Sequence, residues 1–189
     1  MQKIILASSS PRRREILKIL GINFEVIPSN FEEKIKKGLS PEKIVETLAH
    51  GKALDILSKY HDAIIIWADT ICVFENKIIG KPKDLAHAEK MIYSYSNKAM
   101  DVFTWICVIK DERVINYVEE ATIYFGEISK QEAKDFVNKT NPLDKAGGFG
   151  IQELGGILVK RIDGDYYNIV WLPLFGLYNI LKNLWVKIL

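Results

Sequence analysis

Three consecutive arginines, Arg12, Arg13 and Arg14, stand where a helix should begin. Serine is a favoured helix cap and proline a favoured first residue, so Ser10 and Pro11 predict a helix whose first turn holds all three cations. Because a helix N-terminus is electropositive, each of these charges should cost about 0.3 to 1 kcal/mol. The free N–H groups of a helix start and the planar donors of arginine both suit phosphate, which would resolve the conflict. The alternative is that the arginines extend into water, Arg14 above all.

A carboxylate, Asp69, closes the apolar run AIIIWAD. An acid at the end of a buried strand commonly binds a metal or accepts a proton, although it can also be a turn residue. Lys81 follows in IIGKP, after the polar connection 75–77. If that connection folds the two runs into a hairpin, Lys81 lies opposite Ile71 and beside Asp69. A carboxylate and an ammonium would then share one edge.

Two acids and a further lysine extend this set. Glu32 and Glu33 could join Asp69 around a hard cation, which prefers oxygen ligands, although adjacent acids are also typical of a solvated turn. Lys52 shares a predicted helix face with apolar residues, so its stem could lie on the core and its ammonium at the edge of a site. Most lysines on helices are simply solvated.

A glycine-rich segment, DKAGGFGIQELGG, permits close approach of the backbone to a ligand or turns with positive φ. It matches neither a Walker loop nor the G-x-G-x-x-G fingerprint, so alone it is a weak signal. The three histidines show no metal-ligand spacing, and the chain has no G-x-S-x-G elbow. Nucleophilic and zinc-dependent hydrolysis therefore find no support.

The composition indicates a globular protein with no strong field of either sign. The chain has 189 residues, 48% apolar and 11% aromatic, enough for the core of one large domain or two lobes. Its 26 basic and 24 acidic residues give a formal net charge of +2, so any binding of anions must be local. Nucleic-acid binding is the weakest functional hypothesis, because phosphate tracking needs a broad basic stripe.

Both cysteines, Cys72 and Cys107, lie in apolar runs without a C-x-x-C motif, so we expect reduced core thiols. The apolar start 4–7 is shorter than the roughly 7 to 15 residues of a signal-peptide core. Polar residues interrupt the apolar C-terminal stretch before the roughly 18 residues of a membrane span. We therefore expect a cytoplasmic protein with no membrane partner. The apolar positions of that stretch instead share one face of a docking helix, at Leu177, Ile180, Leu181 and Leu184.

Strand and helix patterns alternate along the chain, which predicts an α/β fold with a mixed sheet. The first half predicts strands at 3–7, 23–28 and 63–74 and helices at 11–20 and 41–59. The second half predicts a helix after Asp84, a hairpin of 101–110 and 113–125, a helix opened by a Ser129–Glu132 capping box, strands 156–162 and 166–171, and a C-terminal helix.

Five motifs in chain order, S-S-S-P-R-R, W-A-D-T, G-K-P, D-K-A-G-G-F-G-I-Q and G-D-Y-Y-N-I-V-W-L-P-L, resemble the Maf family of nucleoside triphosphate pyrophosphatases. The resemblance implies a single Maf-like domain over 1–189 with a Maf/ITPase-like fold: an elongated mixed β-sheet flanked by helices, with two lobes and a cleft between them. It also implies a homodimer that hydrolyses a nucleoside triphosphate to the monophosphate and pyrophosphate with a divalent cation, Mg²⁺ or Mn²⁺.

The resemblance also assigns roles to individual residues. The glycine-rich motif is more similar to the branch acting on dTTP and UTP than to the branch acting on methylated guanine nucleotides. By this resemblance the catalytic carboxylate is Asp69, the metal lies near Glu33 and Asp69, the phosphates lie near Arg12, Arg13, Lys52 and Lys81, and the nucleotide is selected by Thr70 and Gln152.

Three tryptophans depart from the family pattern, because Trp67, Trp105 and Trp171 stand where the family usually has glycine. Met100 also replaces a common histidine. Each tryptophan falls on a predicted strand, which favours repacking of the core over a reshaped base pocket. We therefore expect a hydrolase acting on acid anhydrides whose base preference can differ from the family's. The alternative is a catalytically impaired nucleotide-binding regulatory protein.

Overall fold

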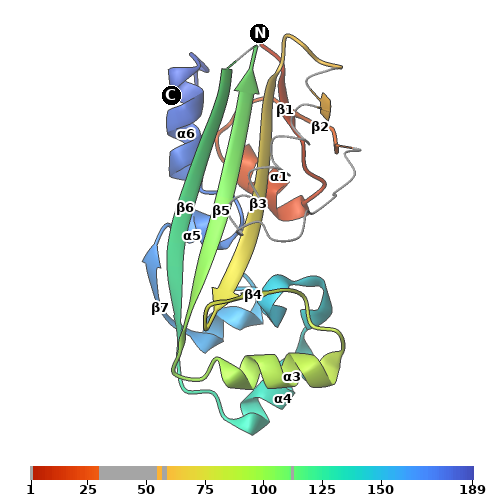
Figure 1. Ribbon diagram of the computed structural model, residues 1–189, viewed down its shortest axis with the longest axis vertical. Helices are drawn as coiled ribbons and strands as arrows, with labels where there is room; N and C mark the ends of the chain where they lie inside the picture. The colour runs from red at the N-terminus through yellow and green to blue at the C-terminus, as the bar shows by residue number, and fades with distance from the viewer. Residues whose placement is uncertain (1, 30–54, 57–58, 112) are drawn as a thin grey trace. The chain divides into compact units, whose positions relative to one another are not determined.

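A computed structural model describes residues 2–29, 55–56, 59–111 and 113–189 (Figure 1). These residues form a seven-stranded sheet in the order β2-β1-β3-β5-β6-β7, with β4 paired to β3. The strands are β1 (Ile4–Leu6), β2 (Glu25–Val26), β3 (Ile64–Phe74), β4 (Lys77–Ile79), β5 (Ala99–Lys110), β6 (Arg113–Phe125) and β7 (Val159–Gly164). The helices are α1 (Pro11–Lys18), α3 (Leu85–Ser94), α4 (Lys130–Lys139), α5 (Tyr166–Ile169) and α6 (Leu174–Asn183).

The sheet is mixed, which confirms the predicted α/β class. β1 runs parallel to β2 and β3, whereas β3–β4 and β6–β7 are antiparallel. β5 and β6 are neighbours in the sheet, as the predicted hairpin requires. The chain divides into two compact units, and β3, β5 and β6 contribute residues to both. The first unit comprises 1–69, 104–119 and 171–189, and the second comprises 70–103 and 120–170.

The first unit has its core around β1 and the start of β3. The apolar run of β1 is buried on both sides, as is typical of a parallel strand inside a sheet. α1 buries Ile16 and Leu17, and it is shorter than predicted because its C-cap is Ile19. In α6 the predicted apolar face is confirmed, since Leu177, Leu181 and the following Leu184 are among its buried positions.

The second unit has an aromatic core centred on Tyr95. Its ring packs edge-on against Phe74 and stacks on Phe125, and its hydroxyl donates to the carbonyl of Gly147 at 3.0 Å. α3 and α4 lie against each other over this core (Figure 1). The predicted capping box of α4 is confirmed, with Ser129 as its cap. The helix start is therefore fixed by local polar groups and its position by packing.

The β3–β4 hairpin has a register one residue away from the predicted one. Cys72 pairs with Ile79, and the pairing ends there. The prediction that Lys81 lies opposite Ile71 is therefore wrong. If the observed register were continued, Thr70 would be the residue opposite Lys81.

The turn of this hairpin explains the shift. Glu75 and Asn76 both have positive φ, 49° and 62°, as in the two-residue turns whose twist matches that of paired strands. Phe74 consequently pairs with Lys77, which the prediction had left in the connection. The polar composition of Glu75-Asn76-Lys77 located the turn correctly but gave its length as three residues instead of two.

The predicted strand 166–171 is wrong, because Tyr166–Ile169 is the short helix α5. Gly164 ends β7 with a φ of 107°, and the carboxylate of Asp165 accepts from the backbone N–H of Tyr167 at 2.7 Å. Aspartate in that position is a helix cap, and this local chemistry outweighs the strand-like composition that follows. β7 also begins later than predicted, because Leu154–Leu158 is a 3₁₀-helix.

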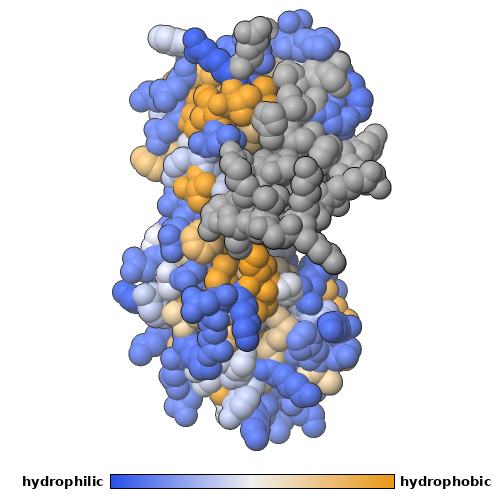
Figure 2. All heavy atoms as spheres, in the orientation of Figure 1, coloured by the Kyte–Doolittle hydropathy of each residue, from blue (hydrophilic) through white to orange (hydrophobic). Residues whose placement is uncertain are grey.

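The surface and the cysteines agree with the compositional expectations. Figure 2 shows a face on which hydrophilic residues predominate and apolar side chains gather in a few patches. Among the described residues, no helix combines the length and apolar composition needed to cross a bilayer. Cys72 and Cys107 are buried free thiols, and burial raises the pKa of Cys107 to about 11. The prediction of reduced core thiols is confirmed.

Candidate active site

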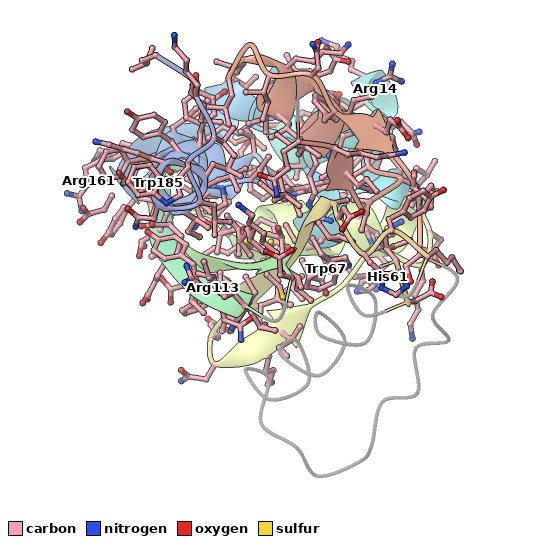
Figure 3. The ribbon with its side chains drawn as sticks, turned by 90° about the horizontal axis from the view of Figure 1, so that it is seen from above. Arg14, His61, Trp67, Arg113, Arg161 and Trp185 are labelled. Atoms are coloured by element: carbon pink, nitrogen blue, oxygen red, sulfur yellow. The ribbon has the colours of Figure 1, made fainter. Side chains whose placement is uncertain are left out.

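The start of α1 is built as the sequence predicts. Ser10 caps the helix, and its hydroxyl accepts from the backbone N–H of Arg13 at 3.4 Å. The first turn holds no acidic residue. Arg13 is buried, Arg12 is half-buried, and Arg14 is exposed at the periphery of the molecule (Figure 3). The expectation that Arg14 extends into water is therefore confirmed, whereas its two neighbours turn toward the protein.

Arg13 contacts Trp171, Ser8 and Asp69 within the first unit. Its Nε donates to the carbonyl of Trp171 at 3.0 Å, and its Nη1 donates to Oγ of Ser8 at 3.4 Å. Its Nη2 lies 3.9 Å from Oδ1 of Asp69, an ion pair longer than a hydrogen bond. Burial lowers the pKa of Arg13 to about 10, against the opposing attraction of Asp69. At neutral pH the guanidinium remains charged and held in one orientation.

Asp69 lies on β3, at the point where the residues of the strand change from buried to half-buried. The five residues before it, Ile64 to Ala68, are buried, but its own side chain is 35% exposed. The carboxylate is therefore accessible to water while a buried guanidinium faces it. This arrangement can orient a water molecule, accept a proton or ligate a cation. It also fits the predicted position of an acid at the end of a buried run.

Arg12 contacts Trp171 as well, but through a different group. Its guanidinium carbon lies 4.4 Å from the ring centroid of Trp171, a cation–π contact. Trp171 therefore contacts one arginine through its indole and the other through its carbonyl. The prediction that Trp171 lies on a strand is wrong, because it follows α5 and has a φ of 86°. Only the structure reveals this junction, since no pattern in the sequence pairs position 171 with positions 12 and 13.

The other two tryptophans are core residues. Trp67 on β3 is 2% exposed and Trp105 on β5 is 7% exposed. Figure 3 shows Trp67 inside the side-chain packing. Their burial favours the interpretation that the core has been repacked at these two positions. Trp171, in contrast, is half-buried and contacts two candidate site residues directly.

The remaining candidates are distributed as follows. Thr70 is half-buried on β3 of the second unit, and Lys81 and Gln152 are exposed residues of the same unit. Because Lys81 is not opposite Ile71 in the observed β3–β4 register, that register gives no reason to expect Lys81 beside Asp69. Glu33 and Lys52 lie outside the described residues. The structure thus brings together Arg12, Arg13 and Asp69, the first through Trp171 and the others directly.

The glycine-rich segment contains a lysine that sequence analysis missed. Lys145 is 4% exposed, and its ammonium lies 2.8 Å from Asp144, 3.1 Å from Glu153 and 2.9 Å from the carbonyl of Asn141. The positive φ of Gly147, 76°, belongs to the same loop. These contacts fix a loop that also carries Gln152. No pattern in the sequence pairs this lysine with its acidic partners, Asp144 and Glu153, because they are one and eight residues away in an irregular loop.

Whether the protein can bind a metal ion depends on the ligands that its side chains provide. Among the described residues, no group of three or more His, Cys, Asp or Glu side chains could hold a metal ion. Asp69 offers one accessible carboxylate, and Mg²⁺ is commonly held by one or two carboxylates together with substrate phosphates and water. The donors present therefore fit a hard cation whose coordination is completed by the substrate.

The chain matches known proteins over most of its length. The family described as "Maf: Maf-like protein" matches residues 3–184. A protein of Bacillus anthracis named dTTP/UTP pyrophosphatase is 42% identical over 183 residues, covering 97% of this chain and 96% of its own. A protein of the same name from Thermosipho africanus is 43% identical, covering 95% and 92%. Among solved structures, the Ham1 protein of Staphylococcus aureus shares 18% identity over 68% of this chain and 73% of its own, with a TM-score of 0.45.

Proposed function

The chain belongs to the Maf family, and from that premise we propose that it is a nucleoside triphosphate pyrophosphatase that acts on dTTP and UTP. The reaction is hydrolysis of the bond between the α- and β-phosphates, which releases the monophosphate and pyrophosphate. Relatives named dTTP/UTP pyrophosphatase at 42% and 43% identity support this assignment. The observation that carries it is the buried, charged Arg13 at a helix start, 3.9 Å from the accessible carboxylate of Asp69.

The two arginines and the helix start would neutralise the triphosphate and the departing pyrophosphate. Guanidinium groups offer parallel N–H donors that match phosphate oxygens, and the free N–H groups of α1 add to the same field. Lys52 and Lys81 are proposed to contribute further positive charge to the phosphates. Lys81 suits this role as an exposed cation after β4.

Asp69 is proposed to orient or deprotonate the water that attacks the α-phosphorus in line with the leaving pyrophosphate. Its partial exposure admits water, and the guanidinium of Arg13 lies 3.9 Å from its carboxylate. Mg²⁺ or Mn²⁺, held by Asp69 and Glu33, would supply charge neutralisation at the phosphate oxygens. Thr70 and Gln152 are proposed to select the nucleotide, as part of the second unit.

The catalytically impaired regulator is the weaker alternative, because Asp69, Arg12 and Arg13 are all present and two of the three replaced glycine positions are simply buried in the core. We further propose a cytoplasmic homodimer that acts as a single domain over 1–189 and does not bind nucleic acid or membranes. Light scattering at several concentrations tests the dimer.

The decisive experiment measures pyrophosphate release from a panel of common and modified nucleotides with Mg²⁺ or Mn²⁺. Wild-type protein should turn over dTTP and UTP faster than the other nucleotides. Asp69→Asn should lose turnover by at least about 100-fold while retaining nucleotide binding, because only the charge of the acid is removed. The matched control is Asp62→Asn, an exposed acid of the same unit. Unchanged turnover in Asp69→Asn would remove that residue from the reaction.

A further inference from the structure

Trp171 holds a backbone conformation that its side chain opposes. Its φ of 86° lies in the left-handed region, where a bulky residue is a genuine outlier. Such strain persists only where the surrounding structure over-determines it, and it is found preferentially at functional sites. A glycine would take this conformation without strain. The indole must therefore contribute something that a glycine could not.

The contacts of Trp171 show what that contribution is. Its carbonyl accepts from Nε of Arg13 at 3.0 Å, and its indole lies 4.4 Å from the guanidinium carbon of Arg12. The carbonyl contact needs only the backbone, so a glycine could make it too. The contact with Arg12 needs the ring. The strained residue thus contacts both arginines of the proposed phosphate site.

A guanidinium group on an indole is restrained without losing its donors. The contact occupies one face of the plane, whereas all five N–H groups lie within the plane and point outward from its edge. A long arginine side chain that is already ordered loses less conformational entropy when a phosphate binds. Stacking therefore prepares Arg12 for bidentate binding of phosphate and does not compete with it.

We propose that Trp171 is a positioning residue that holds Arg12 over its indole for binding of the substrate's phosphates. The inference rests on the proposed function, because it assigns Trp171 a role in that same site. A cation–π contact of this kind corresponds to about a 2- to 30-fold change in an equilibrium. Since the contact exists before substrate binds, its loss acts mainly on KM.

The test compares Trp171→Leu and Trp171→Phe with a matched control, Trp185→Leu. Trp185 is a tryptophan of the same unit that also has positive φ, 63°, but it is 91% exposed and lies at the periphery (Figure 3). Trp171→Leu should raise KM for dTTP and UTP by about 2- to 30-fold with kcat within about twofold. Trp171→Phe should recover most of the loss, and Trp185→Leu should match wild type.

Two further measurements separate positioning from folding. In Arg12→Ala the Trp171→Leu substitution should have no additional effect on KM, because the ring then has no guanidinium to hold. Trp171→Gly should be at least as stable to heat as Trp171→Leu, because the backbone strain is relieved, and yet show the same raised KM. A KM in Trp171→Leu no higher than in Trp185→Leu would overturn the proposal, as would an equal effect of Trp171→Leu in the Arg12→Ala background.

A readout without turnover keeps this inference distinguishable from the proposed function. In nucleotide-free protein, the side-chain protons of Arg12 should show a ring-current shift by NMR that Trp171→Leu abolishes and Trp185→Leu leaves unchanged. Inorganic pyrophosphate should bind more weakly to Trp171→Leu than to wild type. If wild-type protein released no pyrophosphate from any nucleotide, the proposed function would fail while these two measurements still decided the role of Trp171. An unshifted Arg12 resonance in wild type would overturn that role whatever the turnover.

Discussion

The starts of α1 and α4 are two versions of one helix cap with opposite charge at the same position. In each, a serine accepts from the backbone N–H of the third helical residue, Ser10 from Arg13 and Ser129 from Glu132. In α4 the carboxylate of Glu132 accepts in return from the N–H of Ser129 at 2.8 Å. In α1 that third residue is an arginine, which cannot accept a hydrogen bond.

A neighbouring serine takes over the missing half of the cap in α1. The backbone N–H of Ser10 donates to Oγ of Ser8 at 3.3 Å, and the same hydroxyl accepts from Arg13 at 3.4 Å. Glu132 serves its own helix, because an acid there complements the dipole. Arg13 adds positive charge to an electropositive end and is aimed at Asp69. α4 is therefore closed by its own acid, whereas α1 carries a cation at the same position, as the proposed phosphate site requires.

Among the variants that test this comparison of the two helix starts, removing the charge of Arg13 should lower kcat/KM the most. Arg13→Met keeps much of the buried volume but leaves the carbonyl of Trp171 and Oγ of Ser8 without this donor, so the free energy of unfolding should fall by about 1 to 3 kcal/mol. The value of kcat/KM should fall by at least about 100-fold, because the phosphates lose a fixed cation. Steady-state pyrophosphate release and urea unfolding measure the two.

Arg14→Met is the control for this experiment, because Arg14 belongs to the same turn but is exposed. It should change kcat/KM by less than about threefold, since an exposed charge is screened by water and salt. Equal losses in the two variants would mean that α1 attracts the substrate only through its total charge, and the distinction between buried and exposed arginines would be lost.

Ser8→Ala should have an intermediate effect on both stability and turnover. Ser8 is 8% exposed, and removal of its hydroxyl leaves the N–H of Ser10 and one N–H of Arg13 without this acceptor. We expect a loss of about 1 kcal/mol in unfolding free energy and about a tenfold loss in kcat/KM, because the guanidinium is less well held. Ser8→Thr, which keeps the hydroxyl, should restore most of both. If Ser8→Ala lowered stability alone, the serine would be a cap and nothing more.

The chemistry at each helix start was predictable from sequence because caps are local. Ser10 and Pro11 gave the start of α1, and the Ser129–Glu132 spacing gave that of α4, since each pattern lies within one turn. The same locality misled the prediction after Gly164, where Asp165 caps a helix inside a stretch with strand-like composition. The prediction of the β3–β4 turn length was wrong for a related reason, because the register depends on a two-residue turn, Glu75 and Asn76, whose positive φ angles the composition does not reveal.

Contacts between distant segments were not predictable in the same way. Asp69 and the two arginines were identified by type and by their resemblance to a family, but the 3.9 Å approach of Arg13 to Asp69 depends on the parallel pairing of β1 with β3. Trp171 reaches the start of α1 from the other end of the chain, and Lys145 finds its acids inside an irregular loop. Tertiary packing alone creates these pairs.

The smallest effect is expected for Glu132→Gln at the start of α4, and it should be an effect on stability. Hydrogen bonds from Ser129 lower the pKa of Glu132 below its ordinary value of 4.5. A lowered folded-state pKa means that the carboxylate stabilises the protein above the unfolded value and that this contribution is lost as pH falls through the folded one. Glu132→Gln should therefore unfold at a slightly lower urea concentration at pH 7, with the difference shrinking as pH falls below the ordinary value of 4.5, and kcat/KM should not change. A difference that persisted undiminished at pH 3 would mean that the cap depends on the shape of the side chain and not its charge.

The α1 cap should not change in the same way, because Arg13, with a pKa of about 10, keeps its charge over this whole pH range. The two caps should thus respond differently to acid, because only the one closed by a carboxylate titrates.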